Sequence, residues 1–300
     1  MKILILGGGG MLGHKLVQVL GADQALEVHT TVRQSPPREF LIAGVSYHDG
    51  VDLESDLARL KQVLGELAPD VVVNAVGAIK QYKLDSNPER AFWINGELPH
   101  LLPFFNPKPE ARVIHFSTDC VFTGARGNYT ESDRADALDV YGRSKACGEI
   151  DYGPHLTLRT SIIGFELREQ RGLLAWLLSQ PRGSTLRGYR RAIFSGLPTS
   201  VLSLLVRRII LEFPELSGLY HVASQPITKL DLLDRINTLF DLGHTILPDD
   251  SVVIDRSLSD VRFRTATNTT TPNWDVLIPQ LLDDYRSLQY NQTYKISPKA

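Results

Sequence analysis

The chain has 300 residues, of which 43% are hydrophobic and 22% charged, a composition typical of folded globular proteins rather than disordered ones. That length is comfortable for two joined lobes. The formal net charge of −2 argues against a general attraction to nucleic acid or an anionic membrane, and no apolar run approaches the ~18 residues of a membrane span.

The first half of the chain alternates short apolar runs with stretches of helical periodicity. The runs predict strands at Ile3–Leu6, Val28–Val32, Val71–Val76, Arg112–Phe116 and Leu156–Thr160. Helices are predicted over Leu53–Leu67 with Asp52 as N-cap, from Asn87 towards Phe105 with an interruption at Pro99, and over Tyr141–Tyr152. Because strands and helices alternate, we predict an α/β fold with a doubly wound parallel sheet.

Beyond about Ile162 this alternation becomes less regular. Helices are predicted at Gly172–Gln180, Ser200–Phe213 and Thr228–Phe240, and short strands near Leu219–Val222 and Val252–Ile254. We expect a smaller mixed α/β lobe that binds substrate and closes over the ligand edge of the sheet. The predicted division is 1–162 plus roughly 193–222 for the dinucleotide-binding domain, and roughly 163–192 and 223–300 for the substrate-binding lobe.

A glycine-rich turn follows the first predicted strand directly. Gly7, Gly10 and Gly13 are spaced as in a phosphate-binding loop, and Met11 and Leu12 lie between the last two. Backbone N–H groups approach a phosphate only where no Cβ obstructs them, and the following helix presents its positive end. This position after a buried strand predicts a Rossmann-type dinucleotide site.

The end of the second strand decides between the two nicotinamide cofactors. Thr31-Val32-Arg33-Gln34 offers no carboxylate for the ribose hydroxyls, whereas Arg33 can pair with a 2′-phosphate. We therefore favour NADPH over NADH. Other residues expected beside the cofactor are Asp52 and Leu53 near the adenine, and Ala75, Val76 and Gly77 after the fourth strand.

Tyr141-Gly142-Arg143-Ser144-Lys145 is a Tyr-x-x-x-Lys motif whose two side chains share one face of a helix. An ammonium beside the phenol lowers its pKa towards neutrality and makes it a usable proton donor. The motif alone is common. Here Thr118, between Ser117 and Asp119 at the end of a strand, supplies a hydroxyl for a substrate carbonyl at the same sheet edge.

Together, these segments resemble the dTDP-4-dehydrorhamnose reductase family of extended short-chain dehydrogenases. The likeness lies in Phe116–Phe122, in Tyr129-x-Glu131, in the Tyr141–Lys145 motif with Gly148-Glu149, and in later segments at Leu158–Ser161, Gly196–Thr199 and Gly218–His221. It implies NAD(P)H-dependent reduction of the 4-keto group of a nucleotide-linked 6-deoxysugar for cell-surface polysaccharides. By this resemblance Tyr141 donates the proton, Lys145 lowers its pKa and binds the cofactor, and Thr118 binds the carbonyl oxygen.

Members of that family usually carry tyrosine where this chain has Cys120, so a bulkier sugar, such as an acetamido sugar, is one interpretation and a buried packing cysteine the other. Arg187 and Arg190 are candidate substrate contacts because a diphosphate needs cations, Lys80 is a candidate contact to the sugar, and Asp119 is another candidate beside Thr118. Surface arginines that bind no ligand are the equally good interpretation of Arg187 and Arg190.

Three alternatives share the fold. A 4,6-dehydratase would need a glutamate where Cys120 stands. An epimerase uses the same hydride step and stays open. So does a non-catalytic role like that of the regulatory β subunit of methionine adenosyltransferase, which resembles the same family.

The remaining features favour a reducing cellular compartment and give no sign of a metal site. Cys120 and Cys147 lack redox or metal spacing, the first apolar run is too short for a signal peptide, and the histidines show no paired ligand spacing. We expect a cytoplasmic protein with no metal and no nucleic-acid or membrane partner, and leave a homodimer open. His115 is expected to be a core residue, and Asn95 is a candidate support for the nicotinamide side.

Overall fold

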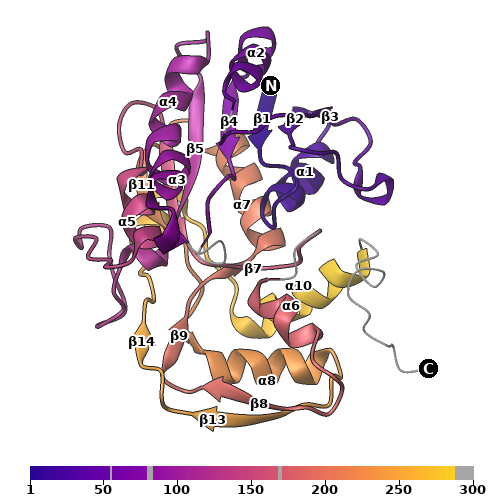
Figure 1. Cartoon of the computed structure of the whole chain (residues 1–300), viewed down its shortest axis with the longest axis vertical. Coiled ribbons are helices and arrows are strands. Elements are labelled where there is room, and N and C mark those ends of the chain that lie inside the picture. Colours follow the sequence, from indigo (N-terminus) through magenta and orange to yellow (C-terminus); the bar gives the residue numbers. More distant parts are fainter. Residues whose placement is uncertain (55, 80–83, 168–170, 288–300) are drawn as a thin grey trace.

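Seven parallel strands form the central sheet of the computed structural model, which describes residues 1–54, 56–79, 84–167 and 171–287 (Figure 1). The spatial order is β11-β6-β5-β4-β1-β2-β3, so the direction of winding reverses between β1 and β4. All six strand pairings are parallel. The strands are β1 (Lys2–Leu6), β2 (Glu27–Thr31), β3 (Ser46–His48), β4 (Val71–Asn74), β5 (Arg112–Thr118), β6 (Leu156–Thr160) and β11 (Gly218–His221). The predicted doubly wound α/β fold is confirmed.

Burial on both faces explains the continuous apolar strands. Ile3 and Ile5 of β1 belong to one buried cluster, and Leu4 and Leu6 belong to another on the opposite face. The first cluster includes residues of α1 (Gly13–Gly21) and α7 (Thr199–Glu212), which pack on each other. The second face is covered by α2 (Ala58–Leu67), α3 (Pro88–Ala91), the π-helix η4 (Phe92–Glu97), α4 (Leu98–Phe105) and α5 (Val140–Cys147).

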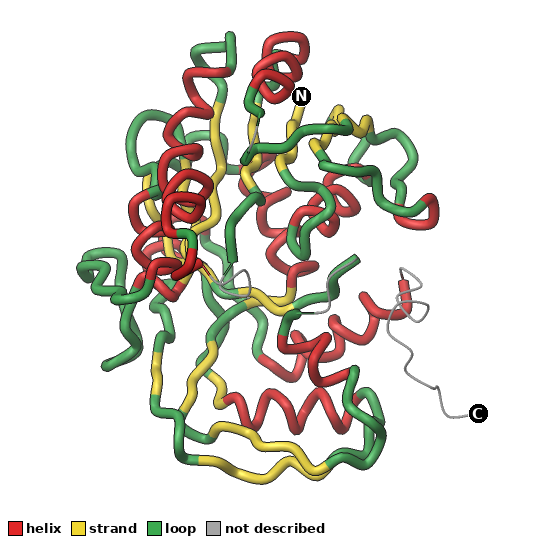
Figure 2. Tube along the Cα trace, viewed as in Figure 1, coloured by secondary structure: helices red, strands yellow, loops and turns green. Residues whose placement is uncertain are grey.

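Helices and short strands are mixed in the lower part of the molecule (Figure 2). Its strands form three small sheets, β10-β7, β12-β9-β14 and β13-β8. They are β7 (Ile162–Ile163), β8 (Thr185–Tyr189), β9 (Ala192–Phe194), β10 (Leu197–Pro198), β12 (Ile227–Thr228), β13 (Thr245–Asp249) and β14 (Ile254–Asp255). The helices are α6 (Leu173–Leu178), α8 (Lys229–Leu239) and α10 (Trp274–Ser287), whereas α9 (Val261–Thr267) packs against β11 of the central sheet. The smaller mixed lobe is thus present, and its predicted residue bounds stay a prediction.

Two helix boundaries differ from those predicted. The helix expected over Leu53–Leu67 begins only at Ala58, so Asp52 is not its N-cap; the carboxylate of Asp52 instead accepts a hydrogen bond from the Glu54 amide at 3.2 Å. The helix expected to reach Tyr152 ends at Cys147. Gly148 then packs so closely on Asn95 that an added Cβ would lie 1.8 Å from the Asn95 carbonyl oxygen, which fixes the chain direction there.

Three short 3₁₀ segments complete the elements: η1 (Arg38–Phe40), η3 (Leu84–Ser86) and η5 (Asp119–Val121). Within the described residues, no helix combines the length and the apolar character that crossing a membrane requires.

Candidate active site

The candidate site lies where β1, β4 and β5 end. Leu6 of β1 pairs with Asn74 of β4, which pairs with His115 of β5, so the loops that follow these strands meet at one edge of the sheet. This edge includes the point between β1 and β4 where the strand order reverses, the usual ligand crevice of open α/β sheets.

The glycine turn is a tight connection between β1 and α1. Gly7 has a φ of +83°, and an added Cβ there would lie 2.8 Å from Val76, so the turn touches the segment after β4. An added Cβ on Gly13 would lie 2.0 Å from the Gly7 carbonyl oxygen. Gly10 donates its N–H to that oxygen at 3.0 Å, and nothing lies within 4 Å of a Cβ added at Gly9. The turn is therefore closed on its inner side and open outward, as a phosphate loop requires.

Residues expected beside a cofactor surround this turn. Ala75 and Val76 are half-buried after β4, and Gly77 is exposed beside them. Arg33 follows β2, is exposed, and makes no ion pair within the part of the chain that the structure describes. Leu53 is buried, and its carbonyl accepts the indole N–H of Trp93 at 2.9 Å.

The open face of the glycine turn, the exposed cation after β2 and the small residues after β4 fit a dinucleotide with a 2′-phosphate. Met11 and Leu12 lie at the start of α1, next to Gly13. An added Cβ on Gly172, just before α6, would lie 2.8 Å from the Met11 side chain, so the lower lobe reaches the turn.

Tyr141 and Thr118 come together because α5 starts against the segment after β5. Asp139 caps the helix by accepting the Gly142 N–H at 2.7 Å, and a Cβ on Gly142 would lie 2.1 Å from the Cys120 carbonyl oxygen. The phenol shares a hydrogen bond with Thr118. Thr118 also accepts the Cys120 N–H at 3.1 Å.

The pKa of Tyr141 is raised above its usual value, first by burial and then by the neighbouring Cys120, Asp119 and Asp139, while the bond to Thr118 opposes the shift. The sequence predicted that Lys145 lowers this pKa; here burial raises it instead, and Lys145 is not among the groups that act on the phenol. The Lys145 amine donates to the Phe116 carbonyl oxygen of β5. A neutral phenol can still donate a proton, so its role as an acid is compatible with this state.

Lys145 is 5% exposed. Its Nζ donates to the Phe116 carbonyl oxygen at 2.5 Å and lies 3.4 Å from Nε2 of His115. Burial lowers the pKa of Lys145 to about 8, although Glu149 acts to raise it. His115 is fully buried, as expected for a core residue, and its Nδ1 lies 3.1 Å from Nδ2 of Asn74. Its pKa lies far below the usual range because of burial and the Lys145 charge.

A buried network behind the site was not predicted as functional. Glu149 accepts Ser117 Oγ and Arg159 Nε, both at 2.6 Å, and Arg159 Nη1 lies 3.2 Å from His221. This network joins β5, β6, β11 and the end of α5, and so fixes the strand end that carries Thr118. Asn95 joins the segment after β4 to α5, since its side chain bonds the backbone N–H and carbonyl of Ala78 and the hydroxyl of Ser144.

The predicted substrate residues separate into two groups. Asp119 and Cys120 lie beside Thr118 and Tyr141. Arg187, in β8, pairs with Asp249 of β13, and Arg190 pairs with Asp250 just beyond these two strands, which form a parallel pair at the bottom of the molecule (Figure 1). The structure does not bring these arginines to the catalytic edge, because acidic partners on the neighbouring strand hold them. Lys80 lies outside the described residues.

Two cations that the sequence reasoning missed do reach the site. The Arg256 guanidinium contacts Cys120, and the charges of Arg256 and Lys229 both act on Asp119. No local motif surrounds either residue. Only the path of the distant lower lobe back to β5 places them there.

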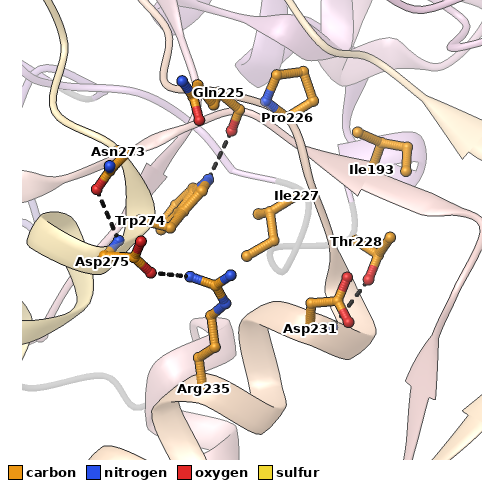
Figure 3. A pocket seen from close by; sticks show the side chains of 10 residues that line it. All are labelled: Ile193, Gln225, Pro226, Ile227, Thr228, Asp231, Arg235, Asn273, Trp274 and Asp275. Carbon is orange, nitrogen blue, oxygen red and sulfur yellow. Dashed lines mark hydrogen bonds and ion pairs between the residues drawn. The ribbon is translucent and has the colours of Figure 1, made fainter.

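A separate cavity of 330 Å³ opens in the lower lobe, between α8 and α10 (Figure 3). In its lining Arg235 pairs with Asp275 at 2.7 Å, and the Trp274 indole donates to the Gln225 carbonyl at 2.6 Å. None of the predicted site residues lines this cavity. Among the described residues, no group of three or more His, Cys, Asp or Glu side chains could hold a metal ion.

The family model described as "RmlD substrate binding domain" matches residues 1–242. The chain belongs to this family. Similar family members include a "Probable low-salt glycan biosynthesis reductase Agl14" of Haloferax volcanii, 28% identical over 85% of both chains. The dTDP-4-dehydrorhamnose reductase of Salmonella typhimurium is 30% identical over 75% of this chain and 73% of its own.

Solved structures agree with the family fold. A hypothetical dTDP-4-dehydrorhamnose reductase from Sulfolobus tokodaii superposes with a TM-score of 0.75 at 26% identity, covering 92% of this chain and 98% of that one. The dTDP-4-dehydrorhamnose reductase of Bacillus anthracis in complex with NADP gives a TM-score of 0.78 at 17% identity, covering 94% and 99%. The family predicted from the sequence motifs is confirmed.

Proposed function

We propose that this protein is an NADPH-dependent reductase that converts the 4-keto group of a nucleotide-linked 6-deoxysugar to a hydroxyl. The observation that carries the proposal is the hydrogen-bonded pair of Thr118 and Tyr141, at the sheet edge that the glycine turn also borders. Relatives over most of the chain are named as a dTDP-4-dehydrorhamnose reductase and a probable glycan biosynthesis reductase.

Each residue of the pair has a distinct task. Thr118 Oγ1 donates to the substrate carbonyl oxygen and orients it, and Tyr141 delivers the proton to the same oxygen as negative charge develops there. Lys145 lies behind them as a buried positive charge, and its proposed task is to hold the nicotinamide ribose. The network of Glu149 and Arg159 holds the strand end that carries Thr118.

The cofactor, when bound, supplies the hydride to the carbonyl carbon of the substrate. The residues that would hold it are the glycine turn with Met11 and Leu12, Arg33 at the 2′-phosphate, Asp52 and Leu53 near the adenine, the Ala75–Gly77 segment, and Tyr141 with Lys145 at the nicotinamide ribose. We place the protein in the cytoplasm. A homodimer is the proposed oligomeric state, and light scattering measures it.

The deciding experiment follows NADPH absorbance with a panel of dTDP- and UDP-linked 4-keto-6-deoxysugars made in situ. We expect net oxidation with at least one sugar. Tyr141→Phe should lower turnover at least ~10²-fold, because a general acid is lost, while NADPH binding measured by fluorescence is kept. Tyr152→Phe is the matched control, since that phenol is exposed and bonds His100 instead.

Other outcomes separate the alternatives. Interconversion of sugars without net loss of NADPH indicates an epimerase. Binding of cofactor and sugar with no turnover in the wild type indicates a regulatory role. Wild-type turnover in Tyr141→Phe removes the assigned proton donor.

A further inference from the structure

A segment of the lower lobe crosses to the catalytic edge and places Arg256 there. Arg256 follows β14, and its Nε donates to the Phe122 carbonyl oxygen at 2.7 Å. Its Nη1 donates to Cys120 Sγ at 3.7 Å. The guanidinium thus lies against the thiol beside Tyr141 and Thr118, although no residue near it in sequence belongs to the catalytic group.

The position of this arginine is fixed by its backbone neighbours on both sides. The Asp255 N–H donates to the Gly124 carbonyl at 2.8 Å, and the Ser259 N–H donates to the Tyr129 carbonyl at 2.7 Å. Leu258 is buried against Phe122 and Tyr129, whose rings stack at 4.1 Å. Because these backbone bonds and the packing of Leu258 hold the segment, the guanidinium is ordered before any ligand binds. This lowers the entropic cost of binding a ligand to it.

The guanidinium has hydrogen-bonding capacity left. Arg256 has five N–H donors, and its two bonds leave Nη2 without a partner among the described residues. The side chain is half-buried. Lys229, the first residue of α8, adds a second positive charge that acts on Asp119, and it donates no hydrogen bond within the described ranges.

No ion pair joins Arg256 to an acidic side chain within the described residues. Burial raises the pKa of Asp119, and the charges of Arg256 and Lys229 oppose that shift. Cys120, which the guanidinium contacts, is a small side chain. A guanidinium with unused N–H donors beside the reacting group favours a planar oxygen acceptor, to which arginine makes charge-assisted bonds.

We propose that Arg256 is a specificity-determining residue that binds the carbonyl oxygen of an acylamino group on the sugar, next to the carbon that is reduced. This inference rests on the proposed function and names its substrate class. The diphosphate of such a substrate is attached at C1, away from the carbon that is reduced. On the sugar ring itself, which has a methyl group at C6 and no carboxylate, an acylamino substituent is the planar acceptor. Hydroxyl groups alone would not need a charged planar donor.

The test compares kcat/KM for two nucleotide-linked 4-keto-6-deoxysugars that differ only in an acetamido group or a hydroxyl at one ring carbon. The wild type should prefer the acetamido sugar by at least ~10-fold. Arg256→Gln should lower kcat/KM for that sugar by ~10–100-fold, as expected for loss of a charge-assisted hydrogen bond, and change the hydroxyl sugar less than ~3-fold. Arg187→Gln, an exposed arginine of β8, is the matched control and should change neither value.

Equal losses with both sugars, or no loss with either, would overturn the inference. If Arg256→Gln does not fold, Arg256→Lys replaces it in the test, because it keeps the positive charge but lacks the planar guanidinium. Arg256→Lys should retain only part of the preference for the acetamido sugar. Binding of the reduced acetamido sugar nucleotide, followed by calorimetry, gives a readout without turnover. Failure of all sugars to oxidise NADPH contradicts the proposed function, whereas equal affinity of wild type and Arg256→Gln contradicts the role of Arg256.

Discussion

Lys145 is a cationic group buried at the centre of the site, with one carbonyl oxygen as its close acceptor. Burial lowers its pKa from 10.5 to about 8, so the folded state binds its proton less tightly than the unfolded state does. Between these two values the unfolded chain carries more protons at this position, and stability therefore rises as pH rises. Below about pH 8 the full cost of the buried charge is present.

This cost should appear in urea unfolding of the ligand-free protein between pH 7 and pH 10. Relative to Lys145→Met, which keeps a stem of similar length without a charge, the wild type should gain up to about 3 kcal/mol of unfolding free energy across this range. Parallel pH curves for the two proteins would contradict the lowered pKa.

Arg33 is the residue on which the choice of cofactor depends. It is exposed after β2 and forms no ion pair within the described ranges, so a 2′-phosphate would meet no competing carboxylate. Arg33→Ala should weaken NADPH by ~10-fold or more, as loss of a charge-assisted contact predicts, and leave NADH nearly unchanged. Fluorescence titration measures both affinities. Equal losses of affinity for NADPH and NADH would contradict the pairing of Arg33 with the 2′-phosphate.

At the scale of elements, the turn between β1 and α1 depends on a close approach of backbone to backbone. A methyl group at Gly13 would meet the Gly7 carbonyl oxygen at 2.0 Å, and no side-chain rotation can relieve that contact. Gly13→Ala should therefore reduce the free energy of unfolding by about 2–3 kcal/mol. Gly9→Ala, whose added methyl group would have no neighbour within 4 Å, should change it by less than about 0.5 kcal/mol. Chemical denaturation compares the two variants, and a stable Gly13→Ala protein would show that the turn can shift.

The elements of the first half were predictable because the signals are local. Apolar runs mark the buried strands, and glycines mark the turn after β1. The start of α2 was not predictable in the same way, since Leu53 fits a helical stripe but its carbonyl is bonded by Trp93, a residue from another helix. The end of α5 likewise depends on Gly148 meeting Asn95, which lies in η4.

At the scale of the whole molecule, the contacts that complete the site join distant parts of the chain. Thr118, Tyr141 and Lys145 were identified from motifs, and the structure brings the threonine and the tyrosine together. Arg256 was missed because its partner Cys120 is 136 residues away, and no periodicity records such a contact. Arg187 and Arg190 were chosen for their charge alone, whereas the acidic residues of β13 already pair with them.

One more long-range contact links the beginning of the chain to its end. Lys15, in the helix that follows the glycine turn, is 1% exposed and forms an ion pair with Asp284 of α10, which is 8% exposed. Burial lowers the pKa of Lys15 and raises that of Asp284, while their mutual attraction opposes both shifts. A buried pair of this kind contributes little net stability, but either charge alone in the same place is costly.

Asp284→Asn should therefore reduce the free energy of unfolding by about 3–5 kcal/mol, because Lys15 stays buried without its counter-charge. The double variant Lys15→Met with Asp284→Leu should regain most of that loss, since both charges are replaced by apolar groups. Urea unfolding of the wild type, the two single variants and the double variant at one pH forms the cycle. If the double variant were as unstable as the sum of the single ones, the two residues would act independently, and the α1–α10 contact would depend on packing rather than on this pair.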